Sequence, residues 1–171
     1  MTVPVIVLTG TVGVGKSTIA TVIHDFLIER NIAHACVDID WLRMSWPERG
    51  SWNSEVAMAN LARTWANFRE AGANRLIIVD VVERRSYLKR YEEAVPGAEI
   101  QVCRLIAPES VREARIAVRE QGASRDWHLA RSIELDGILD EADVADFVVD
   151  NGDRPMLDVA KEVLVRAAWI D

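Results

Sequence analysis

Residues Gly10-Thr11-Val12-Gly13-Val14-Gly15-Lys16-Ser17 match the pattern G-x-x-x-x-G-K-[ST] at every fixed position. An apolar stretch over residues 3–8 precedes them and is typical of a buried strand, and a helical pattern with one apolar face follows. Glycines in such a loop let consecutive backbone N–H groups point at phosphate oxygens, and the helix N-terminus adds partial positive charge. The segment therefore predicts a phosphate-binding loop whose ligand is a nucleoside triphosphate.

Two side chains of this loop carry specific chemistry. We expect Lys16 to contact the β- and γ-phosphates and to act in catalysis, and the Ser17 hydroxyl to bind Mg²⁺. ATP and Mg²⁺ are thus the expected cofactors. The candidate nucleotide-binding residues at this end of the chain are Gly10, Thr11, Val12, Gly13, Val14, Gly15, Lys16, Ser17 and Thr18.

Length and composition indicate one globular domain over residues 1–171. The net charge of −7 argues against a general nucleic-acid surface, and no segment predicts a membrane span. Cys36 and Cys103 lie in apolar runs without metal-binding spacing, which is typical of buried thiols in a cytoplasmic protein. We therefore expect a cytoplasmic protein with no nucleic-acid or membrane partner, either a monomer or a homodimer.

Strand-like and helix-like segments alternate along the chain, which favours a parallel sheet covered by helices. Further strands are expected at residues 33–37, 76–79, 100–106 and 147–149. Helices are expected at residues 54–71, 87–94, from Pro108 onward, and at about 126–141, with a break at Gly122-Ala123-Ser124 and Asp126 as an N-cap. The expected fold class is α/β, a three-layer α/β/α sandwich around a five-stranded parallel sheet.

Two aspartates follow the second predicted strand, in the segment Val37-Asp38-Ile39-Asp40-Trp41-Leu42-Arg43. Residues two apart on a strand point to the same face, and the C-terminal ends of parallel strands open onto one edge of the sheet. A carboxylate there could accept a hydroxyl proton or hold a water of the Mg²⁺ shell. Either aspartate could be the base, and the alternative is that both cap a helix or lie in a solvated turn.

The order of elements over nearly the whole chain resembles the small P-loop kinases, which phosphorylate metabolites, nucleosides or antibiotics. That group includes adenylylsulfate, shikimate, gluconate and adenylate kinases and chloramphenicol phosphotransferase. Residues 10–17 match its phosphate loop, and residues 38–43 are similar to the D-G-D-N-x-R segment of adenylylsulfate kinases. Val81-Val82-Glu83-Arg84 replaces the F-I-S-P segment of those kinases, and their K-G-L-Y lid sequence is absent, which argues against adenylylsulfate itself as the acceptor.

The resemblance implies a strand order of 2-3-1-4-5 and roles for particular residues. It implies Asp38 as the catalytic base and Arg43 as a substrate contact, within a substrate-binding segment at about 38–70. Asp40 and Trp41 are further candidate substrate contacts in that segment. It also implies a mobile helical lid at about 112–131.

Arginines are frequent in the expected lid. Arg112, Arg115 and Arg119 share one helix face, and Arg125 and Arg131 follow. Guanidinium groups brought in by lid closure would stabilise the charge on a transferring phosphoryl group. An R-x-x-x-R segment similar to that of adenylate kinases implies that Arg115 stacks on adenine and that Arg119 contacts phosphate in catalysis.

Arg125 and Arg131 are expected to bind substrate. The alternative for the whole set is a solvated face on which the arginines pair with Glu109, Glu113 and Glu120.

Two further segments are weaker candidates. Asp80 ends the third predicted strand, where an aspartate often reaches Mg²⁺ through water, although a strand-terminal turn would also place it there. The loop from Asn151 to Pro155 lies against adenine in the resembling kinases, which implies that Asn151 and Pro155 bind the cofactor. A turn with an Asp153 helix cap is the alternative.

Trp41, Trp46 and Trp52 are concentrated in the expected substrate-binding segment. Their faces would suit a sugar, a nucleoside or another ring-bearing acceptor, and core packing is the alternative. No N-K-x-D guanine motif or transporter-ATPase signature is present. The sequence therefore predicts a kinase that transfers the γ-phosphate of ATP to a hydroxyl of a small-molecule acceptor. The alternative is a catalytically weak ATP-binding switch that regulates a partner protein.

Overall fold

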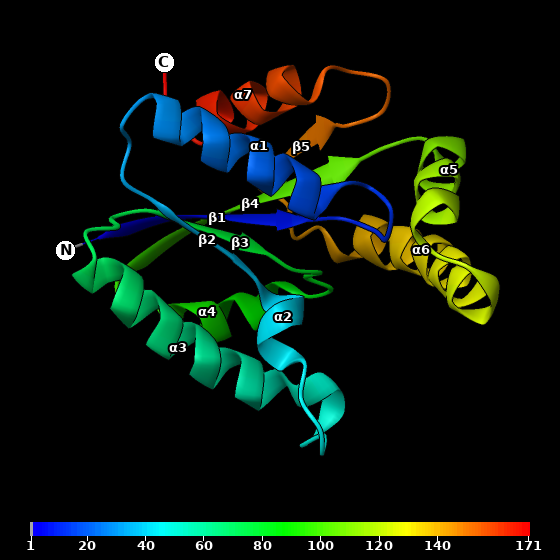
Figure 1. Ribbon diagram of the computed structural model, residues 1–171, viewed down its shortest axis with the longest axis horizontal. Coiled ribbons are helices and arrows are strands. Elements are labelled where there is room, and N and C mark those ends of the chain that lie inside the picture. Colours follow the sequence, from blue (N-terminus) through cyan, green and yellow to red (C-terminus); the bar gives the residue numbers. More distant parts are fainter. Residues whose placement is uncertain (1) are drawn as a thin grey trace.

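A sheet of five parallel strands crosses the centre of the computed structural model, which describes residues 2–171 (Figure 1). The strand order is β2-β3-β1-β4-β5. The strands are β1 (Val3–Thr9), β2 (Ala35–Asp38), β3 (Leu76–Val79), β4 (Ala98–Ile106) and β5 (Phe147–Asp150). Both the α/β class and the predicted strand order are confirmed.

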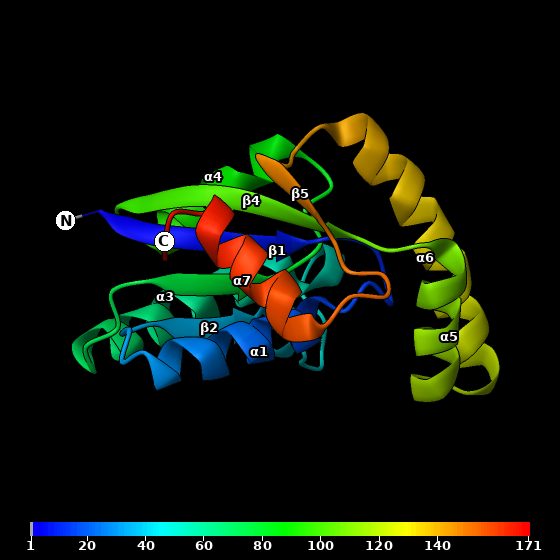
Figure 2. The ribbon, with the colours of Figure 1, turned by 90° about the horizontal axis from the view of Figure 1, so that it is seen from above.

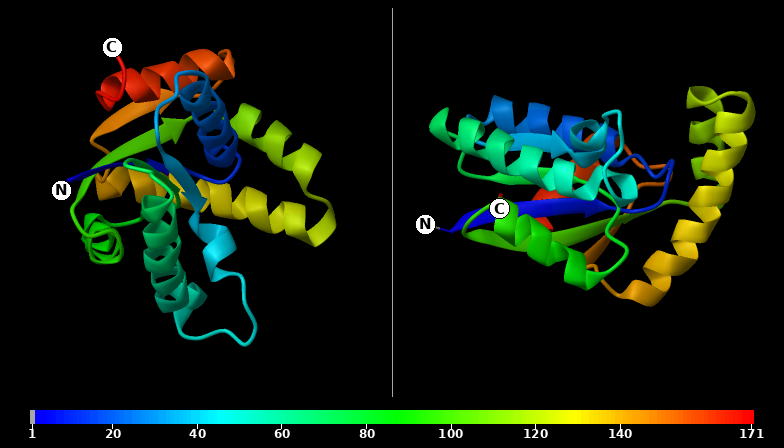
Figure 3. Two further views of the ribbon diagram at one scale, coloured as in Figure 1. Left: turned by 60° about the vertical axis from the view of Figure 1, so that its left-hand side comes forward. Right: turned by 90° about the horizontal axis from the view of Figure 1, so that it is seen from below.

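Helices cover both faces of this sheet (Figures 1 and 3). One face packs against α1 (Lys16–Glu29) and α7 (Met156–Arg166), and the other against α3 (Ser54–Glu70) and α4 (Leu88–Ala94). The alternation of β1 explains the two cores, because Ile6 and Leu8 point to the first face while Val5 and Val7 point to the second. No helix within residues 2–171 is long and apolar enough to cross a membrane.

Parallel register brings the candidate site residues to one edge. Asp38 pairs with Val79, and Val79 pairs with Leu8 of β1. Asp38, Asp80 and the loop after Thr9 therefore leave the sheet side by side. This edge is the carboxyl end of the strands, where ligands bind in open α/β sheets.

The segment after β2 differs from the prediction. The strand ends at Asp38, whose carboxylate accepts the backbone N–H of Asp40 at 3.0 Å and caps the short helix α2 (Ile39–Arg43). The prediction that Asp38 and Asp40 share one strand face is therefore wrong, because an N-capping aspartate starts a helix at this point. A loop and a 3₁₀ turn, η1 (Ser51–Asn53), connect α2 to α3.

Two helices, α5 (Glu109–Arg119) and α6 (Gly122–Ala142), stand beyond the end of the sheet (Figure 2). The predicted break at residues 122–124 is wrong, since extended backbone at Glu120 and Gln121 separates the helices and Gly122 begins α6. Asp126 consequently lies inside α6 and caps nothing. The remaining turn, η2 (Arg85–Tyr87), precedes α4.

Candidate functional site

The phosphate loop has the conformation that its glycines predict. Gly13 and Gly15 have φ values of 80° and 95°. A Cβ at Gly13 would lie 2.8 Å from the Arg112 carbonyl oxygen, and one at Gly15 would lie 2.7 Å from Nδ2 of Asn151. Only glycine fits this curled backbone against its neighbours.

Lys16 lies inside the curl of the loop, where its Nζ donates to the carbonyl oxygens of Gly10 at 2.8 Å and Thr11 at 3.0 Å. Burial lowers the pKa of Lys16 to about 8, and the negative charges of Asp40, Asp80 and Asp38 oppose that shift. The ammonium group is thus held at the point where the loop would bind phosphate. Carbonyl contacts of this kind are exchangeable for phosphate oxygens, so the residues fit a triphosphate.

Side chains from two segments far away in the sequence hydrogen-bond to the backbone of the phosphate loop. Arg115 donates to the carbonyl oxygens of Val14 at 3.2 Å and Gly152 at 3.0 Å, and Nδ2 of Asn151 donates to Val14 at 2.7 Å. The predicted adenine contacts Arg115 and Asn151 therefore lie against the phosphate loop. Pro155 occupies the N-cap of α7 and does not line the cavity described below.

Ser17 and the two aspartates form a second cluster. The Ser17 hydroxyl donates to Oδ2 of Asp38 at 2.8 Å, while Oδ1 of Asp38 accepts the Asp40 amide. Both oxygens of Asp38 are therefore engaged. The exposed carboxylate of Asp40 pairs with the Arg43 guanidinium, with Oδ1 at 3.3 Å from Nε.

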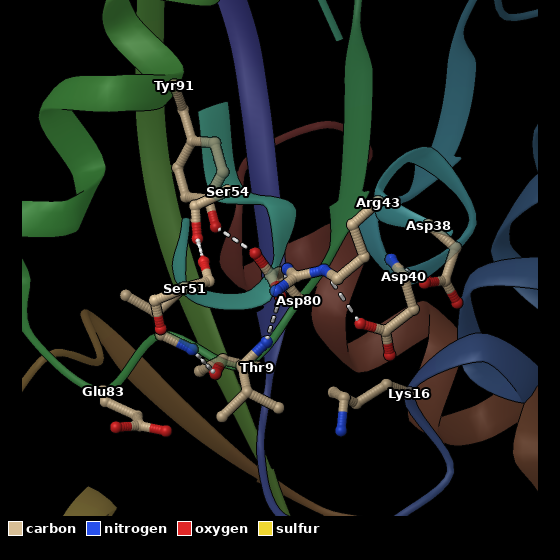
Figure 4. Close-up of polar contacts among 12 residues, drawn as sticks. Thr9, Lys16, Asp38, Asp40, Arg43, Ser51, Ser54, Asp80, Glu83 and Tyr91 are labelled. Atoms are coloured by element: carbon tan, nitrogen blue, oxygen red, sulfur yellow. Dashed lines mark hydrogen bonds and ion pairs between the residues drawn. The ribbon is translucent and has the colours of Figure 1, made fainter. Parts of the chain in front are cut away.

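Asp80 follows the end of β3 and is mostly enclosed in a third cluster (Figure 4). Its Oδ1 accepts from the Arg43 guanidinium at 2.9 Å and from the Val81 amide at 2.8 Å, and its Oδ2 accepts from the Tyr91 hydroxyl at 2.6 Å. Burial raises the pKa of Asp80, opposed mainly by Arg43. Burial also raises the pKa of Tyr91 well above its usual value, with the Asp80 charge adding to the shift.

A cavity of about 710 Å³ joins these clusters. Its floor is formed by the phosphate-loop residues Val12, Gly13 and Gly15 to Thr18, and the lining also includes Asp38, Asp40, Arg43 and Asp80. The rest of the lining comes from the α2–α3 region, from β3 and the segment after it, from η2 and α4, and from the helices beyond the sheet. It includes Trp52, Glu55, Met58, Tyr91, Trp127, His128 and Arg131. The space is thus large enough for a nucleotide phosphate tail and a small second molecule.

The predicted lid arginines have different surroundings. Arg119 lines the cavity and pairs with Glu120 at 3.0 Å. Arg131 also lines it, but its guanidinium is held by Glu83 and Glu134. Arg112 is buried in an ion pair, and Arg125 is exposed and does not line the cavity.

Among the predicted aromatic contacts, Trp52 lines the cavity, whereas Trp41 and Trp46 are exposed and do not. Sequence reasoning missed Trp127 and Tyr91. Trp127 lies within the segment predicted as a lid, so its sequence position could have indicated a role in the site. The position of Tyr91 gives no such indication, since it is typical of an ordinary core helix.

No protein-family model and no curated protein matches the sequence. Solved structures match over nearly the whole chain. A gluconokinase from Sinorhizobium meliloti 1021 is 21% identical with a TM-score of 0.64, covering 97% of this chain and 92% of its own. A shikimate kinase from Bacteroides thetaiotaomicron is 15% identical with a TM-score of 0.63, covering 96% and 98%.

The structure of the Mycobacterium tuberculosis APS kinase CysC in complex with AMPPNP and APS is 19% identical to this chain. Its TM-score is 0.61, and the match covers 99% of both chains. The fold is therefore that of the small P-loop kinases. These structures are named as kinases of different acceptors. The structural similarity therefore defines the fold, and the identity of the acceptor has to be inferred from the residues that line the cavity.

Proposed function

We propose that the chain is an ATP-dependent kinase that transfers the γ-phosphate to a hydroxyl of a small molecule, such as a metabolite, a nucleoside, a sugar or an antibiotic. The observation that carries the proposal is one continuous cavity. The ammonium of Lys16, the carboxylates of Asp38 and Asp40, and a partly aromatic wall all line it. An ATP-binding switch needs the first of these features but not the others.

Ser17 and Asp38 fit a magnesium site, since they present hard oxygen donors held 2.8 Å apart beside the phosphate loop. When bound, Mg²⁺ would neutralise negative charge on the phosphates. Asp80, predicted as a metal ligand, is paired with the Arg43 cation and also accepts from Val81 and Tyr91, whereas the hydroxyl bound to Asp38 belongs to Ser17, itself a proposed ligand. We therefore assign Asp80 to orienting Arg43 toward the acceptor.

Asp40 is the better placed of the two candidate bases. Both oxygens of Asp38 accept hydrogen bonds, whereas the Asp40 carboxylate is exposed to the cavity. In the proposed reaction the acceptor oxygen forms a bond to the γ-phosphorus, the bond to the β,γ-bridging oxygen breaks to release ADP, and the hydroxyl proton passes to the carboxylate. Arg119, which also lines the cavity, would stabilise the charge of the departing phosphoryl group.

The test is an ADP-release assay with a panel of hydroxylated metabolites and antibiotics, each compared with the rate without acceptor. We expect at least one acceptor to raise ADP release and yield a phosphorylated product by mass spectrometry. Lys16→Ala should abolish that increase and weaken binding of ATP more than binding of ADP, because Lys16 is the cation expected at the γ-phosphate. A partner-dependent response with no acceptor in the panel would favour the switch, and equal affinities of wild type and variant for ATP would contradict the role of Lys16.

A further inference from the structure

Two tryptophans from separate elements form an aromatic pair that lines the cavity. Trp52 belongs to η1 and Trp127 to α6, and their ring centroids lie 6.5 Å apart with the planes inclined by 39°. Both rings line the cavity, yet 60% of Trp52 and 50% of Trp127 remains exposed. Apolar surface of this size is left in contact with water inside a polar cavity, although closer packing would bury it.

The backbone at Trp52 is strained. Trp52 has φ 56° and ψ 29°, and Asn53 follows with φ 47°, so two successive residues adopt the left-handed conformation. Asparagine tolerates that conformation, but a bulky residue such as tryptophan adopts it rarely and at a cost in free energy. Strain of this kind persists where the surrounding structure enforces it, most often at ligand sites.

Asn53 enforces this conformation. Its buried side chain donates to the carbonyl oxygens of Arg43 at 2.9 Å and Ser45 at 3.2 Å, and it accepts the Arg49 amide at 2.6 Å. These hydrogen bonds fix the α2–α3 loop around the Asn53 side chain, and the Trp52 ring lies against α6. The loop therefore holds the ring partly exposed at the cavity.

Trp127 is supported from the other side. The His128 ring packs edge-on against it, with centroids 4.9 Å apart and an interplanar angle of 90°. His128 is fixed in turn by a 2.7 Å contact from Nδ1 to the Ser124 carbonyl oxygen, in which Nδ1 is the donor. Both tryptophans are thus held by hydrogen-bonded neighbours.

We propose that Trp52 and Trp127 form an aromatic clamp that binds a planar conjugated ring of the acceptor. This assignment of the acceptor class rests on the proposed kinase function. A flat ring in van der Waals contact with both indoles needs the planes about 7 to 8 Å apart. The indoles now form a tilted pair whose centroids, 6.5 Å apart, are at the distance of a direct aromatic contact, so a ring enters only when the two indoles separate and turn parallel. The acceptor class is a hydroxyl compound that carries a flat ring, such as a nucleoside or an aryl glycoside, in preference to a saturated polyol.

Matched ligand pairs test the clamp through tryptophan fluorescence and calorimetry. Adenosine is compared with ribose, and phenyl glucoside with methyl glucoside, so that each pair differs in the flat ring. We expect the planar member of each pair to bind more tightly and to quench fluorescence. Trp52→Leu and Trp127→Leu should each weaken its binding by about 5- to 150-fold, the scale of one aromatic stacking contact.

Trp46→Leu is the control, because Trp46 is an exposed tryptophan of the same loop that does not line the cavity. Since Trp52 and Trp127 are half exposed, both variants should keep the wild-type circular dichroism spectrum, and Trp52→Gly serves as a second variant that suits the left-handed backbone. Equal affinity within each pair, no binding of either planar probe, or planar binding that survives both substitutions would overturn the clamp.

Failure of the clamp and failure of the kinase are distinguishable. Planar probes that bind through the two tryptophans without any ADP release would support the clamp and contradict the kinase. Acceptors that are phosphorylated with no preference for a flat ring, and equally well by Trp127→Leu, would support the kinase and overturn the clamp.

Discussion

Replacing Asp136 by alanine should destabilise the protein, because one carboxylate serves two poorly exposed arginines. Its Oδ2 lies 2.9 Å from Arg112, whose side chain is 6% exposed, and its Oδ1 lies 3.4 Å from Arg104, whose side chain is 12% exposed. Breaking a fully buried ion pair from one side costs about 3–5 kcal/mol. Asp136 itself is 37% exposed, so water can partly replace it, and we expect a loss of about 2–4 kcal/mol in the free energy of unfolding.

For a chain of this length such a loss lowers Tm by about 5–12 °C. The measurement is thermal unfolding followed by circular dichroism, with urea unfolding to obtain the free energy. Asp140→Ala is the matched control: Asp140 also pairs with Arg104, at 2.7 Å, but its side chain is 71% exposed. A surface pair of this kind contributes less than about 1 kcal/mol. Equal effects of the two substitutions would refute the view that shared, buried charge holds α5 and α6 to β4.

Three further predictions concern other residues. Asp40→Asn should lower kcat by about 10²-fold or more with little change in ATP affinity, whereas Asp38→Asn should mainly weaken metal-dependent ATP binding. Steady-state kinetics measure the first effect and calorimetry the second, and the reverse pattern would indicate that Asp38 is the base. Burial raises the pKa of Cys36 to about 11 and that of Cys103 to about 12. The thiolate fraction of Cys36 at pH 8 is then about 10⁻³, so iodoacetamide should label Cys36 slowly, and about tenfold faster for each added pH unit. In denaturant both cysteines should be labelled rapidly. Fast labelling of the native protein at pH 8 would contradict this buried environment. Trp52→Gly should leave the free energy of unfolding unchanged or raise it by up to about 1 kcal/mol, because relief of left-handed strain opposes the added entropy of the unfolded chain; a clear loss in urea unfolding would mean that the ring itself stabilises the loop.

The sheet and the phosphate loop could be predicted because their signals are local. Four of the five strands are short apolar runs, and the loop glycines meet a backbone that excludes a Cβ. The sequence favours a strand face shared by Asp38 and Asp40 and gives helix capping by both as the alternative, and the structure shows capping for Asp38. Its role as the N-cap of α2 depends on where the strand ends, and element ends are weakly encoded in a single sequence.

The parts of the site that were missed depend on contacts between distant segments. The Tyr91 hydroxyl, on α4, donates a hydrogen bond to Asp80. The Asn53 side-chain amide donates hydrogen bonds to residues at the other end of its loop. Neither residue type is unusual at its position in the sequence. The arginines could not be assigned for the same reason, since Arg112 and Arg115 share a face with Arg119 but contact residues far away in the sequence that only the packed structure reveals.

Those contacts narrow the part of the predicted lid that is free to move. Arg115 fastens α5 to the phosphate loop, and the Ser132 hydroxyl fastens α6 to the Val12 carbonyl oxygen at 3.0 Å. The chain between these two points, residues 116–131, forms the tip of the helical pair, and its only buried apolar side chain is Ile116 at the base. Few buried apolar contacts give a segment low local stability. We therefore place any motion of the lid in this tip, which carries both Arg119 and Trp127. Because Trp52 and Trp127 must separate to admit a flat ring, binding of that ring would move the tip and shift Arg119 with it.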